Sequence, residues 1–145
     1  MAEQATDPLT EEGAVFPHWS LKGVKCNCKV TGVYDGDTIT IALPVGDKYY
    51  RFKTRLEGIN TPEIRTRDID EKLEGLETRD WLRTQILDEI VWVECGAFDK
   101  YGRLLATIYR EEGAEMSVNT ELITTKRAVE YHGGTKPKWV SKLKI

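Results

Sequence analysis

The fold is decided by one stretch of the chain, residues 35–56, which reads DGDTITIALPVGDKYYRFKTRL. Turn-forming residues occupy positions 35–37 and 44–47. Between and after these turns, at 39–43 and 50–56, apolar side chains alternate with polar or small ones. A period of two is typical of strands with one buried face. The stretch therefore predicts a hairpin of two strands.

The same alternation recurs on both sides of this hairpin. It predicts one strand before the hairpin, at 24–31, and two strands after it, at 90–95 and 103–109. A helix is predicted at 72–89, between the hairpin and these last two strands, and a second helix capped by Ser117 follows them. Three consecutive strands joined by hairpins form a meander. Five short strands with two helices predict a mainly β fold, a small five-stranded barrel of the OB-fold kind.

Length and composition indicate one domain that is not a membrane protein. The chain has 145 residues and a mass of 16.5 kDa, with 40% hydrophobic residues, a size that allows a substantial core. The longest apolar run, residues 90–93, is too short to span a bilayer, and no secretory signal is visible. We divide the chain into a flexible acidic arm (1–20), a barrel domain (21–140) and a basic tail (141–145).

The net charge of −3 is unevenly distributed. The arm holds four acidic residues and no Lys or Arg, so the other 125 residues carry +1. Two segments are basic: residues 51–67 carry +3 and residues 126–145 carry +5. This distribution favours a nucleic-acid partner, although a solvated surface of mixed charge explains it as well.

Three cysteines, Cys26, Cys28 and Cys95, form no disulfide framework. We expect buried thiols in a reducing compartment, which favours an intracellular protein. A zinc site using these residues with His18 or His132 is the alternative, but the spacing fits no usual pattern.

Three short segments contain the residues that carry chemistry. They are residues 34–38 (YDGDT), 55–63 (RLEGINTPE) and 99–103 (DKYGR). Each has an ordinary structural interpretation as a turn, a loop or a connection between strands. Together they hold oxygen ligands for a hard cation, a glutamate able to activate water and two arginines that can bind phosphate oxygens. These groups are the parts needed to hydrolyse a phosphodiester.

In order and spacing, these segments resemble the three signature segments of the staphylococcal nuclease (thermonuclease) family. The resemblance covers about residues 24–135. It implies a five-stranded barrel, one Ca²⁺ ion as cofactor, and hydrolysis of DNA or RNA with little sequence specificity, leaving 3′-phosphate ends. It also implies that nucleic acid is the partner; no membrane or protein partner is implied, and we expect a monomer.

Carried over position by position, the resemblance assigns ten residues. Arg55 and Arg103 resemble phosphate-binding arginines, and Glu63 resembles the general base. The cation ligands correspond to Asp37, Asn60 and Thr61, and the carboxylate behind those ligands corresponds to Asp35. The residues that contact the nucleotide correspond to Lys100, Tyr101 and Tyr131. Matching Tyr131 requires a gap of one residue.

Two features depart from the family pattern. Asn60 stands where the family has Asp, and the loss of one negative charge predicts weaker calcium binding or another metal preference. Little sequence follows residues 133–134, so the last helix of the family is expected to be short or absent. A catalytically weak or inactive nucleic-acid-binding or scaffold domain remains an alternative, as does an inhibitor or protein-interaction module.

Overall fold

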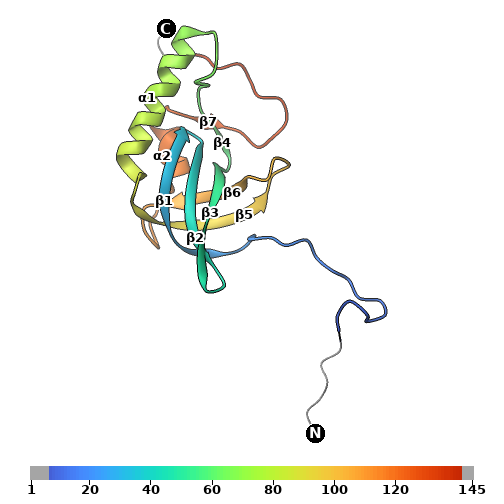
Figure 1. Cartoon of the computed structure of the whole chain (residues 1–145). Coiled ribbons are helices and arrows are strands. Elements are labelled where there is room, and N and C mark those ends of the chain that lie inside the picture. The colour runs from blue at the N-terminus through green and yellow to red at the C-terminus, as the bar shows by residue number, and fades with distance from the viewer. Residues whose placement is uncertain (1–6, 142–145) are drawn as a thin grey trace.

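A closed barrel of five strands forms the centre of the molecule (Figure 1). The computed structural model describes residues 7–141. Around the barrel the order is β1-β2-β3-β6-β5. The strand bounds are β1 (Lys25–Asp35), β2 (Thr38–Val45), β3 (Lys48–Leu56), β5 (Ile90–Phe98) and β6 (Leu104–Tyr109). All neighbours are antiparallel except β3 and β6, whose parallel pairing closes the barrel. The predicted mainly β, five-stranded barrel with two helices is confirmed.

The period-two pattern of the strands builds the core. In β2, Ile39, Ile41 and Leu43 are fully buried and alternate with partly exposed neighbours. The predicted inward face of β3 is only partly correct, because Tyr50 is 49% exposed while Thr54 and Leu56 are buried. Tyr50 lies in the part of β3 next to the hairpin turn, where residues 48–51 are all exposed, and Figure 1 shows the β2–β3 hairpin projecting from the barrel.

Helix α1 (Ile69–Ile86) packs against β1, and the shorter α2 (Val118–Thr124) packs against β6. Helix α1 begins three residues before the predicted start, because Asp68 caps it by accepting hydrogen bonds from the backbone of Asp70 and Glu71. The side chain of Ser117 caps α2 as predicted. Leu73 on α1 is 53% exposed and does not join the core.

A second, two-stranded sheet was not predicted. It pairs β4 (Ile59–Asn60) with β7 (Val129–Glu130). Strands of two residues are too short to show a period, so sequence alone does not reveal them. This small sheet places the chain around residues 129–131 beside residues 58–60, which becomes important at the site below.

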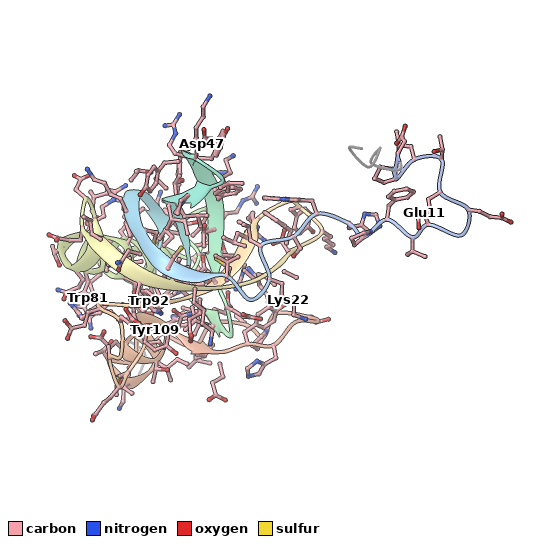
Figure 2. The ribbon with its side chains drawn as sticks, turned by 90° about the horizontal axis from the view of Figure 1, so that it is seen from below. Glu11, Lys22, Asp47, Trp81, Trp92 and Tyr109 are labelled. Atoms are coloured by element: carbon pink, nitrogen blue, oxygen red, sulfur yellow. The ribbon has the colours of Figure 1, made fainter. Side chains whose placement is uncertain are left out.

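Residues 7–20 contain no helix or strand and are mostly exposed. Figure 2 shows Glu11 on a segment that leads away from the barrel, beyond Lys22. Trp19 packs on Phe52 and Phe98 with ring centroids 6.5 and 5.8 Å apart, whereas Phe16 is 59% exposed. Trp19 thus contacts the barrel. The three-part division of the chain stays a prediction, and residues 1–6 and 142–145 of its two ends lie outside the described residues.

The three cysteines are free thiols on one side of the barrel core. Burial raises the pKa of Cys28 to about 12 and that of Cys95 to about 11, with smaller contributions from neighbouring thiols, and burial also raises the pKa of Cys26. Within residues 7–141, no group of three or more His, Cys, Asp or Glu side chains is arranged to hold a metal ion. That range also contains no helix long and apolar enough to cross a membrane.

Candidate active site

The turn between β1 and β2 lies against α1 and the chain after β4. Gly36 is buried at this turn, where an added Cβ atom would lie 2.4 Å from Cγ2 of Thr78 and 3.0 Å from Cγ2 of Thr61. Only glycine allows so close an approach. Asp37 itself is 8% exposed and accepts hydrogen bonds from Thr38 Oγ1 (3.1 Å) and from the backbone N–H of Thr61 (3.4 Å).

The ladder between β2 and β3 sets Arg55 beside this turn. Thr38 pairs with Arg55, and the backbone N–H of Leu56 donates to the carbonyl of Asp37 at 2.8 Å. The Arg55 guanidinium donates through Nη1 to the carbonyl of Leu56, and its Nη2 lies 3.7 Å from Asp37 Oδ2. Nη2 is buried and has no hydrogen-bond partner among residues 7–141. A buried donor of this kind is suited to bind an anion.

Asp37, Asn60 and Thr61 form a buried group that we call the cation-site residues. Asn60 ends β4, and its Oδ1 is buried without a hydrogen-bond partner in the described part of the chain. An unpaired buried oxygen costs about 1–3 kcal/mol. A carboxylate, an amide oxygen and a backbone carbonyl are the ligand types that Ca²⁺ prefers. The residues therefore fit a hard cation, with fewer carboxylates than an all-acidic site would have.

Asp35 lies within electrostatic reach of this group. Burial raises the pKa of the Asp35 carboxyl above its usual range, and the negative charges of Asp37 and Glu63 raise it further. The positive charges of Arg65 and Arg79 act in the opposite direction but do not cancel the rise. The structure thus brings three predicted acidic residues close enough to repel one another, an arrangement that a bound cation would relieve.

Glu63 lies on the loop that follows β4. Its backbone N–H donates to Glu71 Oε2 at 2.8 Å, which ties the loop to the first turn of α1. Its carboxylate accepts from Lys136 Nζ at 3.1 Å, and both side chains are about half exposed. Sequence analysis did not identify Lys136, because nothing in the chain marks a residue 73 positions away as a partner.

Arg103 is held by a residue that sequence analysis did not single out, Asp99. The Asp99 carboxylate accepts from the backbone N–H groups of Tyr101 and Arg103 at 2.8 and 2.9 Å, and from Arg103 Nε at 2.9 Å. Partial burial raises the pKa of Asp99, but these hydrogen bonds and the charge of Arg103 outweigh that effect and lower it overall. An Asp that begins a turn ending in Gly is the signal that could have revealed this role.

A pocket of about 840 Å³ collects both arginines and all three predicted nucleotide contacts. The walls come from the end of β3 and the turn after it, the connection between β5 and β6, and the chain after β7. The lining residues are Arg55, Glu57, Gly58, Asp99, Lys100, Tyr101, Arg103, Leu105, Tyr131, His132, Gly133, Gly134, Thr135 and Lys136. Figure 1 shows the β5–β6 connection and the segment after β7 on the same side of the barrel.

Each tyrosine of the pocket faces a cation. The guanidinium carbon of Arg55 lies 5.5 Å from the ring centroid of Tyr131, and that of Arg103 lies 5.4 Å from the ring of Tyr101. Lys100 Nζ is 5.2 Å from the ring of Tyr101. Tyr131 reaches this position because its backbone N–H donates to the carbonyl of Gly58 at 2.9 Å, continuing the β4–β7 sheet.

The cation-site residues, Asp35 and Glu63 do not line the pocket. Arg55 connects the two regions, because it lines the pocket and lies 3.7 Å from Asp37. Lys136 connects them a second time, since it lines the pocket and binds Glu63. The ten predicted residues thus fall into two adjoining groups rather than one.

The segment after the pocket returns to α1. Glu74 is buried on α1 and accepts hydrogen bonds from Trp139 Nε1 and, at 3.0 Å, from Ser141 Oγ. These contacts anchor the end of a segment whose residues 133–136 line the pocket. Residues 125–141 contain no helix.

Comparison with known proteins identifies the family of the chain. The family model described as staphylococcal nuclease homologue matches residues 53–141, which include both arginines, Asn60, Thr61 and Glu63. No curated protein was found whose sequence matches this chain. The family is one of nucleases that act on nucleic acids. Since its model covers more than half of the sequence, the chain belongs to the staphylococcal nuclease homologue family.

Proposed function

We propose that the protein is a Ca²⁺-dependent nuclease that cleaves DNA or RNA with little sequence specificity and leaves 3′-phosphate ends. One observation carries the proposal: Arg55 borders both the cation-site residues and a pocket that contains Arg103 and two tyrosines. A phosphate bound between the two arginines would lie where the two regions meet.

The pocket suits a nucleotide without selecting its base. Guanidinium groups bind phosphate oxygens through paired hydrogen bonds, and Lys100 adds a further positive charge at the rim. Tyr101 and Tyr131 offer ring faces on which any base can stack. Stacking on a ring face uses no hydrogen bonds to base edges, so it does not distinguish one base from another.

In this proposal, the attacking water, the phosphate and the cation are each bound by specific residues. Glu63 would orient a water molecule and accept its proton, and Arg55 with Arg103 would stabilise the charge that develops on the phosphate oxygens. Asp37, Asn60 and the carbonyl of Thr61 would hold the cation, with Asp35 behind them. When bound, a cation of this kind supplies positive charge that polarises the phosphate and orients the reactants.

Glu63 must leave Lys136 before it can act as a base. Ion pairs between half-exposed side chains contribute only about 0–1 kcal/mol, and both partners of this pair are about half exposed. Nucleic acid phosphates offer Lys136 an alternative partner, so substrate binding can release the carboxylate at little cost.

The proposal is tested by incubating the purified protein with plasmid and with single-stranded DNA and RNA in Ca²⁺, in Mg²⁺ and in EDTA. Cleavage in Ca²⁺ that stops in EDTA, with 3′-phosphate and 5′-hydroxyl product ends, is expected. Binding of single strands in EDTA without cleavage under any metal condition would instead support the alternative of an inactive nucleic-acid-binding domain. Sedimentation of the same sample tests the expected monomer.

A further inference from the structure

We propose that His132 is the general acid that protonates the leaving 5′-oxygen. This inference rests on the proposed nuclease function and adds a catalytic residue that the three signature segments do not contain. His132 follows Tyr131 directly and lines the same pocket as Arg55 and Arg103. Its imidazole thus lies in the pocket that would hold the nucleoside attached to a phosphate bound by the two arginines.

The β4–β7 sheet fixes where this histidine lies. The backbone N–H of Tyr131 donates to the carbonyl of Gly58, and the imidazole Cε1 of His132 lies 3.7 Å from the position of a Cβ atom on Gly58. The same sheet pairs Asn60 with Val129. His132 is three residues after Val129, the partner of Asn60, and three residues of extended chain span about 10 Å. The histidine is therefore about that far along the chain from the position opposite Asn60.

This separation places His132 and Glu63 in different regions of the site. Glu63 lies outside the pocket that His132 lines, and the guanidinium of Arg55 stands at the boundary. Displacement at phosphorus needs the attacking and leaving oxygens roughly in line. With water held on the Glu63 side, the leaving oxygen of a nucleoside stacked on Tyr101 or Tyr131 must face the pocket.

The chemistry of the step balances with these two residues. The water oxygen forms a bond to phosphorus and gives a proton to the Glu63 carboxylate. The bond between phosphorus and the 5′-oxygen breaks, and that oxygen keeps the electron pair and takes a proton from the His132 imidazolium. The products are a 3′-phosphate and a 5′-hydroxyl, and solvent returns the proton to the neutral imidazole.

Imidazole can give a proton to a leaving oxygen and take one back from water, and histidine is the side chain that most often acts in this way. The charged side chains that line the pocket with it are Arg55, Glu57, Asp99, Lys100, Arg103 and Lys136. Asp99 is already engaged by three hydrogen bonds from its own turn.

The test compares two oligonucleotide substrates that differ in one atom. One has the normal 5′-oxygen at a single cleavable linkage, and the other has sulfur there. A thiolate leaves without needing a proton. A variant that lacks the general acid should therefore cleave the sulfur substrate at nearly the normal rate. We expect His132→Gln to lower kcat on the oxygen substrate by about 10²–10³-fold, with little change in KM, and to cleave the sulfur substrate within about threefold of the unsubstituted protein.

Two variants serve as controls. Glu63→Gln should be slow on both substrates, because its defect precedes loss of the leaving group, and His18→Gln, in the arm, should match the unsubstituted protein on both. Equal loss of His132→Gln activity on both substrates, or no loss on either, would overturn the role of His132. If the unsubstituted protein cleaves neither substrate in Ca²⁺, the proposed nuclease function itself fails.

Discussion

Arg55 Nη2 and Asp37 Oδ2 lie 3.7 Å apart in a buried setting, with both side chains about 10% exposed. Within residues 7–141, this ion pair is one of two contacts between the two groups of predicted site residues, and the other is the Lys136–Glu63 pair. The Arg55–Asp37 pair depends on the β2–β3 ladder, which sets Thr38 opposite Arg55. A change at either residue therefore alters both regions.

The contacts of the Arg55 guanidinium predict that a positive charge at this position is not enough for full activity. Arg55→Lys keeps the positive charge but cannot contact the Leu56 carbonyl, Asp37 and a phosphate at once. We expect kcat to fall by about 10²–10³-fold. Arg51→Lys, on the exposed part of β3, is the matched control and should leave kcat unchanged. Similar activity in the two variants would show that the paired geometry is not needed.

Restoring a carboxylate at position 60 should strengthen calcium binding. Asn60 Oδ1 is buried without a hydrogen-bond partner, and a charged oxygen there would attract a cation more strongly. We expect Asn60→Asp to lower the Kd for Ca²⁺ by about tenfold, equivalent to about 1.4 kcal/mol. Titration calorimetry measures this directly. Unchanged or weaker binding would place the cation elsewhere.

The raised pKa of Asp35 predicts a stability effect with a defined sign. Because the folded-state pKa lies above that of the unfolded chain, stability falls as pH rises from about 4 through the folded-state value. Asp35→Asn removes this penalty, so its Tm in EDTA at pH 7 should exceed that of the unsubstituted protein. Added Ca²⁺ should raise Tm less in the variant. A lower Tm in EDTA would contradict the repulsion among Asp35, Asp37 and Glu63.

Gly75 on α1 is predicted to position the loop that carries Glu63. A Cβ atom at this residue would lie 2.8 Å from the carbonyl oxygen of Pro62 and 3.2 Å from the backbone carbon of Glu63. Gly75→Ala should therefore cost about 1–3 kcal/mol of unfolding free energy, despite the better helix propensity of Ala, and should also lower kcat. Leu73→Ala, at an exposed position of the same helix, should affect kcat little.

Gly75 also illustrates what sequence alone could and could not predict. By propensity alone, a glycine near the start of a helix only weakens that helix; in the structure Gly75 is a close contact between α1 and the loop after β4. The barrel strands were predictable because burial on one face imposes a period of two. The β4–β7 sheet, which brings Tyr131 to Arg55, was not, because its strands have two residues each.

The candidate site shows the same division. Residues within one signature segment, such as Asp37 or Arg103, could be proposed because their segments resemble the family pattern in order and spacing. Lys136 was not, since its contact with Glu63 joins residues 73 positions apart and arises only in the folded chain. The partition of the ten predicted residues into two adjoining groups likewise follows from tertiary structure.

The most direct test of the account is the Ca²⁺-dependent cleavage rate of Glu63→Gln. Single-turnover cleavage of one defined oligonucleotide is measured for this variant, for the unsubstituted protein and for Glu112→Gln, a matched change in the exposed connection before α2. The account predicts a rate at least about 10²-fold lower for Glu63→Gln, an unchanged rate for Glu112→Gln, and equal substrate affinity in EDTA for all three. Equal cleavage rates for Glu63→Gln and the unsubstituted protein would contradict the proposed catalytic role.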